Sequence, residues 1–189
     1  MKRLSPTAII VLIATVILLA DQWSKYLAHD YFVPTTDIGA SDSAPREREP
    51  KMVISGFLEF RHAHNTGAVG GLLSGNNGLL MALSGLAIVL LIVFRRSFVT
   101  SHAEHLVALG LITGGIAGNF VDRLVRGYVE DFLVLYVGKM QITYVFNIAD
   151  AAICSGVVVY IIALLLPRKQ PESAPAPGAT PRREVQQAP

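Results

Sequence analysis

Asp150 is an acidic residue with no opposite charge near it in the sequence. It lies six residues after Tyr144, inside an apolar stretch, and no lysine or arginine occurs within four positions of it. A buried carboxylate without a partner is energetically costly, so Asp150 requires a partner from a distant part of the chain. Its position favours a functional role, because two carboxylates at one site can act as general acid and general base in hydrolysis.

Other polar residues near apolar segments occur in pairs one helical turn apart. Three pairs have this spacing: Asp21 with Lys25, Asn119 with Arg123, and Asp122 with Arg126. Side chains four positions apart face each other on a helix, and opposite charges at this spacing neutralise each other. On local grounds these pairs are structural.

Asp131 differs from Asp122 in its sequence neighbours. Asp122 has Arg123 beside it and Arg126 one turn further on, and nearby cations hold a carboxylate in its ionised form. Asp131 has only Glu130 beside it and is followed by apolar residues. Asp131 is therefore able to share a proton with a second carboxylate, whereas Asp122 suits a supporting role.

The composition indicates a membrane protein. Hydrophobic residues make up 52% of the 189 residues and charged residues only 16%, against about 25% charged residues in soluble domains. The mean hydropathy is +0.48. Uncharged apolar runs approach the length of about 20 residues that a helix needs to cross a bilayer. The net charge of +2 is too small to indicate a nucleic-acid partner.

The apolar runs predict an all-α membrane protein of four transmembrane helices. A small β-rich extracytoplasmic platform is predicted between spans one and two, where residues 52–60 are β-prone. Closely spaced glycines between residues 110 and 118 should let the third span approach its neighbours. The predicted segments are 1–28 for the N-terminus and span one, 29–71 for an outer linker (34–50) and the platform, 72–94 for span two, 95–104 for a cytoplasmic loop, 105–121 for span three, 122–143 for an outer loop, 144–166 for span four, and 167–189 for a disordered tail.

Basic residues predict the direction in which the chain crosses the membrane. The N-terminus, the loop between spans two and three, and the tail hold eight lysines and arginines against three acids. The positive-inside rule therefore places both termini in the cytoplasm. The polar ends of spans one, three and four then fall in one layer at the outer face, and so many polar residues at one depth indicate a site.

Three other interpretations of the polar residues are open. An ion pathway needs polar residues through the full membrane depth, but the inner halves of spans two and four offer only Tyr160. A structural subunit without catalysis would leave Asp150 without a purpose. His62 and His64 alternate as on a strand and could bind a metal, although a solvated pair is the plainer interpretation.

Four motifs occur in a fixed order along the chain. They are Asp21-Gln-Trp-Ser-Lys25, Asn65-Thr-Gly-Ala68, Gly118-Asn-Phe-Val-Asp-Arg123 with Val129-Glu-Asp131, and Phe146-Asn-Ile-Ala-Asp150. On a frame of four spans, this set closely resembles the lipoprotein signal peptidase (signal peptidase II) family. The resemblance covers roughly residues 6–166 and leaves out the linker and the tail.

The resemblance implies an aspartyl endopeptidase of the bacterial inner membrane. Its substrate would be a prolipoprotein carrying diacylglycerol on a cysteine, cut just before that cysteine. The partners implied are such substrates and membrane lipids, with no metal, cofactor or second copy of the chain. By motif match the catalytic pair is Asp131 and Asp150. Residues matched to substrate binding or support are Asp21, Lys25, Asn65, Gly67, Asn119, Asp122, Arg123 and Asn147.

Two features depart from the pattern of the family. A bulky aromatic residue usually follows the Asn-x-Gly-Ala segment, but Val69 and Gly70 follow it here. The linker 34–50 is also longer than usual. The first departure affects substrate contacts around the 65–71 loop. The second affects the placement of the outer loop over the site.

Overall fold

Four helices hold the apolar segments in the computed structural model of the protein, which describes residues 4–33, 48–68, 70, 72–93 and 102–166. Three of them are long and apolar enough to cross a membrane, and the fourth is a shorter apolar helix of 17 residues. The three long helices are α1 (Pro6–Phe32), α4 (Ala103–Arg126) and α5 (Ile148–Leu165), and the shorter one is α2 (Asn77–Val93). The protein is a multi-pass membrane protein.

The surface of α1 is that expected of a helix in lipid. Ser5 caps its N-terminus by accepting a hydrogen bond from the backbone N–H of Ala8, and Pro6 occupies the first turn, where its missing N–H costs nothing. Large apolar side chains of the helix, such as Leu12 and Leu19, are exposed. The buried residues of α1 instead include Asp21 and Lys25, so this charged pair faces the protein.

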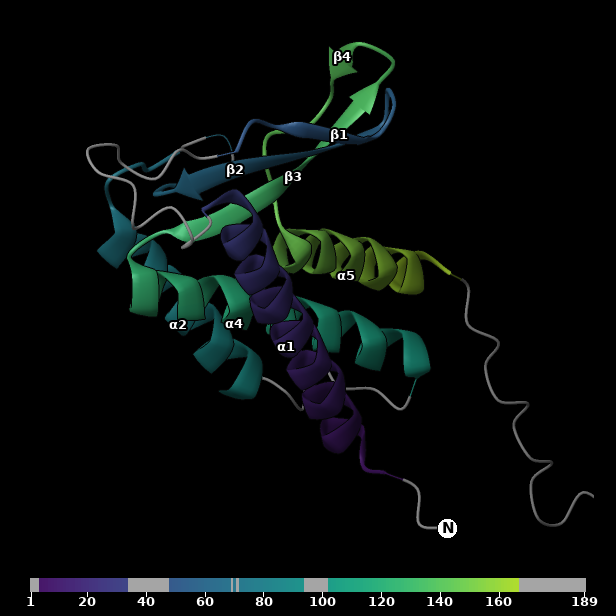
Figure 1. Ribbon diagram of the computed structural model, residues 1–189. Coiled ribbons are helices and arrows are strands. Elements are labelled where there is room, and N and C mark those ends of the chain that lie inside the picture. The colour runs from purple at the N-terminus through teal and green to yellow at the C-terminus, as the bar shows by residue number, and fades with distance from the viewer. Residues whose placement is uncertain (1–3, 34–47, 69, 71, 94–101, 167–189) are drawn as a thin grey trace, which may run out of the picture.

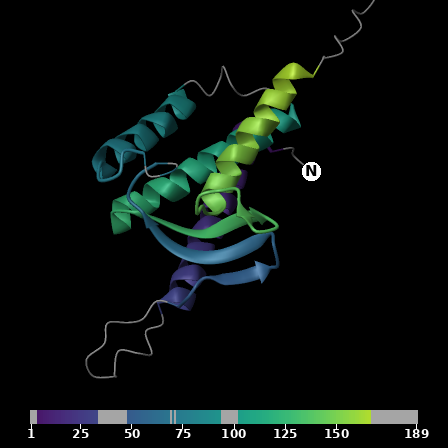
Figure 2. The ribbon, with the colours of Figure 1, turned by 90° about the horizontal axis from the view of Figure 1, so that it is seen from above.

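Helix α4 lies at the centre of the helical layer and packs against α1, α2 and α5 (Figures 1 and 2). Its glycines allow this close packing, as the sequence predicts. A Cβ atom on Gly115 would lie 2.4 Å from the carbonyl oxygen of Ala149 in α5, and one on Gly118 would lie 2.5 Å from a carboxylate oxygen of Asp21 in α1. Any side chain at these positions would separate α4 from its neighbours.

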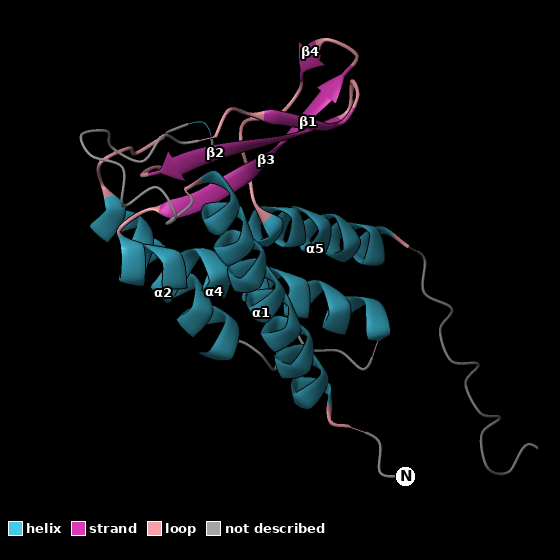
Figure 3. Cartoon of the chain, viewed as in Figure 1, coloured by secondary structure: helices cyan, strands magenta, loops and turns pink. Residues whose placement is uncertain are grey.

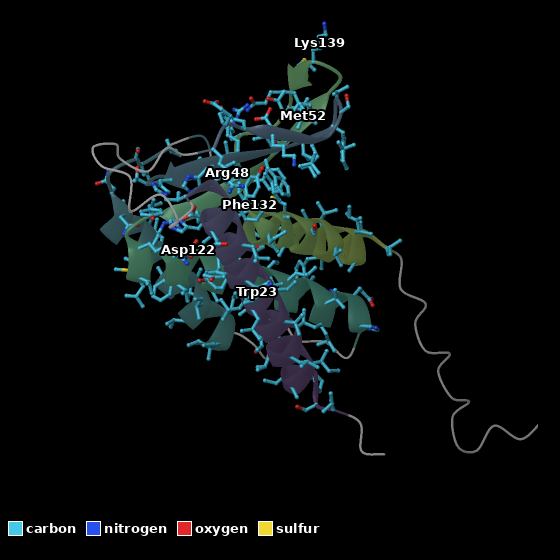
Figure 4. All side chains as sticks on the ribbon, viewed as in Figure 1. Trp23, Arg48, Met52, Asp122, Phe132 and Lys139 are labelled. Atoms are coloured by element: carbon cyan, nitrogen blue, oxygen red, sulfur yellow. The ribbon has the colours of Figure 1, made fainter. Side chains whose placement is uncertain are left out.

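A four-stranded antiparallel sheet covers one end of the helices (Figures 1 and 3). Its strands follow the order β1 (Lys51–Ile54), β2 (Leu58–Asn65), β3 (Val129–Val137) and β4 (Met140–Gln141). Phe132 of β3 is buried, whereas Lys139 lies at the tip of the β3–β4 hairpin, far from the helices (Figure 4). The sheet therefore forms a cover whose β2–β3 part lies nearest the helix ends.

The sheet differs from the predicted platform in its origin. Only β1 and β2 come from the segment between α1 and α2, and β3 and β4 come from the segment between α4 and α5. The fold is thus mixed α and β rather than purely α-helical. The prediction missed β3 because this strand pairs with β2, more than 60 residues earlier in the chain, and such a distant pairing leaves no local pattern.

Several predicted segments lie outside the described residues. These are most of the linker 34–50, most of the loop 95–104, and the tail 167–189.

Candidate active site

Asp150 lies at the start of α5, where it takes part in a capping box. Asn147 is the N-cap, and its side-chain oxygen accepts a hydrogen bond of 2.9 Å from the backbone N–H of Asp150. In return the Oδ2 atom of Asp150 accepts one of 3.3 Å from the backbone N–H of Asn147. This reciprocal arrangement satisfies two N–H groups at the helix end and fixes the position of the Asp150 carboxylate.

Asp131 lies on β3 with its carboxylate held between two amides. The side-chain nitrogen of Asn147 donates a hydrogen bond of 2.6 Å to Oδ1 of Asp131, and that of Asn65 donates one of 3.0 Å to Oδ2. The antiparallel register, in which Ala63 of β2 lies opposite Asp131, brings Asn65 within reach. Asp131 is 1% exposed, so both of its oxygen atoms depend on these amides.

Asn119 of α4 joins the two carboxylates to the rest of the helices. Its side-chain nitrogen donates a hydrogen bond of 2.7 Å to Oδ1 of Asp150. Its side-chain oxygen accepts hydrogen bonds from Asn147, at 3.1 Å, and from the ammonium group of Lys25, at 3.0 Å. Asp150 thus obtains the distant partner that its sequence position requires, and this partner is an amide rather than a cation.

A buried group of charges supports Asn119 from behind. The Nζ atom of Lys25 lies 2.8 Å from Asp21 and 2.7 Å from Asp122, and all three side chains are fully buried. Asp122 also pairs with Arg126. The sequence predicts two separate helical pairs, and both are present, but the structure joins them into one network across α1 and α4.

Gln22 belongs to this network, although the sequence pattern does not predict a role for it. Its side-chain nitrogen lies within hydrogen-bond distance of Asp21, Asp122 and the carbonyl oxygen of Gly118. Its position directly after Asp21 is the one feature of the sequence that could have indicated this role. A glutamine next to a charged pair has no distinctive spacing of its own, however.

Arg123 connects the site to the loop that follows β2. Its guanidinium donates hydrogen bonds of 2.9 Å to the carbonyl oxygen of Gly67 and 3.3 Å to that of Asn119. The backbone N–H of Gly67 in turn donates to the side-chain oxygen of Asn65, at 2.9 Å. Asn65, Gly67 and Arg123 therefore form one chain of contacts that ends at Asp131. The expected pairing of the Asn119 and Arg123 side chains is not what forms, because Arg123 contacts the Asn119 backbone.

Both carboxylates face one cavity of about 860 Å³. Asn65, Asn119 and Arg123 line its polar part, together with Asp131 and Asp150. The remaining wall is mostly apolar and comes from α2, α4, α5 and the β3–α5 segment: Leu80, Leu83, Ile116, Ile153, Val145 and Phe146. The cavity can therefore hold a ligand that is apolar over most of its length and presents one polar group to the carboxylates.

The surroundings of Asp131 favour its protonated form. Burial and, to a smaller extent, the nearby negative charge of Asp150 raise the pKa of this carboxyl to about 7, although the hydrogen bonds from Asn65 and Asn147 act in the opposite direction. Two neighbouring carboxyls tend to share one proton, because both cannot ionise cheaply. This pair can accordingly supply an acid and a base at the same time.

The expectation of a solvated histidine pair on β2 is wrong for His62. Its side chain is only 3% exposed and contacts Glu130, whereas that of His64 is 41% exposed. The sequence pattern indicates that both face the same side of the strand but does not reveal that α1 and Glu130 cover that side.

A pair of carboxyl groups, held by amides at the end of a bundle of membrane-length helices, is an arrangement suited to an aspartyl peptidase of the membrane. A family model described as signal peptidase (SPase) II matches residues 13–166. The chain belongs to the signal peptidase II family.

Similar proteins agree with this assignment. Lipoprotein signal peptidase of Moorella thermoacetica is 34% identical over 156 residues, covering 82% of this chain and 92% of that protein. Lipoprotein signal peptidase of Coxiella burnetii (strain RSA 493) is 34% identical over 157 residues, covering 81% of this chain and 87% of that protein. A bacterial membrane enzyme solved by the in meso method at 2.3 Å resolution has 30% identity and a TM-score of 0.66, covering 82% of this chain and 87% of that one.

Proposed function

We propose that this protein removes signal peptides from bacterial prolipoproteins that carry diacylglycerol on a cysteine, and that it cuts immediately before that cysteine with Asp131 and Asp150 as the catalytic pair. The observation that supports the pair is its geometry. Two carboxylates from different elements, β3 and α5, face one cavity. Asn147 donates a hydrogen bond to each of them, from its side-chain nitrogen to Asp131 and from its backbone N–H to Asp150.

The two carboxyls divide the work of peptide hydrolysis. Asp131 is the more deeply buried of the two and supplies the proton, and Asp150 acts as the base. Asp150 takes a proton from a water molecule as the oxygen atom of that water attacks the scissile carbonyl carbon, and Asp131 gives its proton to the carbonyl oxygen. When the resulting diol collapses, the C–N bond breaks, the leaving nitrogen takes the proton held by Asp150, and a diol hydroxyl returns a proton to Asp131.

The asparagines position the carboxyls and do not exchange protons. Asn65 and Asn147 orient Asp131, and Asn119 orients Asp150. Lys25, Asp21, Asp122 and Arg123 act one step further out, through Asn119 and the 65–67 loop. Fixed dipoles of this kind stabilise charge without reorganising during the reaction. The chemistry needs no metal or cofactor, so chelator treatment should leave turnover unchanged.

The shape of the cavity fits a lipid-anchored substrate. Apolar side chains of α2, α4 and α5 form most of its wall, and acyl chains or an apolar signal peptide lose little by moving from the bilayer onto such a surface. The scissile bond then reaches the polar end, where the carboxylates lie. Membrane lipids border the site, and one copy of the chain contains all of the residues used.

The same proposal includes the topology. α2 spans about 25 Å at 1.5 Å per residue, close to the hydrocarbon core of about 30 Å, and serves as the second of four membrane spans. The basic residues place both termini in the cytoplasm. The site and the sheet then lie at the extracytoplasmic face of the inner membrane, within reach of water.

Cleavage of a defined substrate tests the proposal. Purified protein in detergent is incubated with a diacylglyceryl prolipoprotein, and the product is detected by its shift on a gel and by mass spectrometry. We expect cleavage before the modified cysteine, and little or none with the same precursor lacking diacylglycerol. Failure of well-folded protein to cut, or a cut at another bond, would contradict the proposal.

A further inference from the structure

A second cluster of polar residues is built around Glu130, and one of its members, His64, also lines the cavity that Asp131 and Asp150 face. Glu130 precedes Asp131 on β3, and successive residues of a strand point to opposite faces. His64 of β2 is the register partner of Glu130, and His62 lies two residues earlier on the same face. His29, in the last turn of α1, completes the cluster. Three elements that are distant in sequence thus bring three imidazoles and one carboxylate together.

The four side chains are close enough to bind one ion. One potential ligand atom from each of them lies within 4.8 Å of every other. Glu130 contacts the Nε2 atom of His62, its Oε1 atom lies 3.7 Å from Nδ1 of His29, and its Oε2 atom lies 3.9 Å from Nε2 of His64. Tetrahedral zinc has bonds of about 2.0–2.1 Å, which places its ligand atoms about 3.3 Å apart. The observed distances require only small movements to match.

Two of the four side chains are buried, and two are partly exposed to solvent. Glu130 and His62 are 1% and 3% exposed at their side chains, whereas His29 and His64 are 47% and 41% exposed. Two ligands are therefore buried by the fold, and the other two lie closer to solvent. An ion can also reach the cluster from solvent past the exposed pair.

The negative charge of the buried Glu130 carboxylate would be compensated by a bound cation. A buried carboxylate is costly unless it is paired and hydrogen-bonded. The Oε2 atom of Glu130 is buried, and no hydrogen bond reaches it from the part of the chain that the structure describes. Its three ion-pair contacts there are all with histidines, which are charged only when protonated. A divalent cation would compensate this charge without protonating the imidazoles.

The surroundings of the cluster hold its ligands in place. The ring of Phe32 stacks on that of His62, with centroids 5.7 Å apart and planes inclined by 13°, and the ring of Tyr128 lies 4.0 Å from that of His64. The backbone N–H of Glu130 donates to Asp122, at 3.3 Å. Such outer contacts orient metal ligands and raise the affinity of a site.

We propose that His29, His62, His64 and Glu130 form a binding site for a divalent transition-metal ion, with Zn²⁺ as the best match. Three imidazole nitrogens and one carboxylate oxygen are ligands that zinc prefers, and four protein ligands close its tetrahedron, as in structural sites. The ion joins the end of α1 to β2 and β3. Since Asp131 faces the other way, the ion does not touch the reacting atoms.

Zinc binding to the full chain tests this proposal without any measurement of peptidase activity. Protein purified without a polyhistidine tag is stripped with a chelator, exchanged into clean detergent buffer and titrated with Zn²⁺ against a competing chromophoric chelator. We expect one ion per chain. The His62→Gln and His64→Gln variants should each bind at least about tenfold more weakly. His102→Gln is the matched control, because His102 lies at the start of α4, outside the cluster, and it should bind as the unaltered chain does.

Thermal unfolding provides a second measurement on the same samples. An ion that binds only the folded chain raises its Tm, so Zn²⁺ should raise the Tm of the unaltered chain and of His102→Gln but not that of His62→Gln. His64→Gln replaces a half-exposed side chain and should fold, which guards against a loss of binding caused by misfolding. The absence of stoichiometric binding in the unaltered chain, or equal affinity in the folded His64→Gln variant, would overturn the proposal.

Discussion

Asp122 and Asp131 are nine residues apart in the chain, but the side chains around them differ in charge. Asp122 contacts Lys25, Arg126 and Gln22, whereas Asp131 is held by neutral amides and faces the cavity. Replacement of aspartate by asparagine keeps the shape and removes the titratable group. Asp131→Asn and Asp150→Asn should each lower turnover by at least about 100-fold without loss of membrane insertion. The double variant should be no worse, because the two act as one unit.

Asp122→Asn is the matched comparison for that experiment. Removal of one member of a buried ion pair costs about 3–5 kcal/mol, so this variant should lose stability and yield while turnover per folded molecule changes little. Turnover in membranes and detergent, divided by the amount of folded protein, separates the two effects. A folded but inactive Asp122→Asn enzyme together with an active Asp131→Asn enzyme would show that the pair is assigned wrongly.

The raised pKa of Asp131 predicts a pH dependence. Burial and the charge of Asp150 raise this pKa from its ordinary value to about 7. The carboxyl therefore holds its proton below about pH 7 and loses it above, and a mechanism that needs the protonated form slows as the pH rises. Single-turnover cleavage by chelator-treated enzyme should fall about tenfold per pH unit above this value. A rate that stays constant from about pH 6 to about pH 9 would assign the acid to another group.

At the scale of elements, the contact between α4 and α5 sets the position of Asp150. A Cβ atom at Gly115 would lie 2.4 Å from the backbone oxygen of Ala149, the residue before Asp150. We expect Gly115→Ala to lower the free energy of unfolding by about 1–3 kcal/mol and to reduce turnover, because backbone cannot move aside as a flexible side chain can.

Gly85 in α2 is the control for the added methyl group. The nearest described atom to a Cβ atom there is a ring carbon of Phe120, at 3.6 Å, which is an ordinary contact. Alanine is also the better helix former, so Gly85→Ala should match or exceed the original stability. Thermal unfolding of both variants in detergent measures the difference. Equal behaviour of the two would mean that α4 and α5 tolerate separation.

At the scale of the whole molecule, the sheet and the polar site lie at one end of the helices, and the proposed orientation places that end outside the cytoplasm (Figure 1). Reporter fusions after residue 45 and after residue 170 should report opposite sides of the membrane, the first outside and the second in the cytoplasm. The physical reason is the excess of basic residues in the segments assigned to the inside. Reporters on the same side would exclude an arrangement of four spans.

Local chemistry in the sequence was sufficient to predict the membrane class, the order of the helices, the close approach at the α4 glycines and the set of polar residues that meet at one end. These features follow from composition, apolar run length and helical spacing, which depend on neighbours in the chain.

Only the tertiary structure decided the remaining features of the fold and the site. It paired β3 with β2, joined the Asp21–Lys25 and Asp122–Arg126 pairs into one network, and gave Asp150 its partner Asn119. It also buried His62 against Glu130. Each of these contacts joins residues 31 to 97 positions apart. No local pattern specifies such contacts, because they form only when the helices and the sheet pack together.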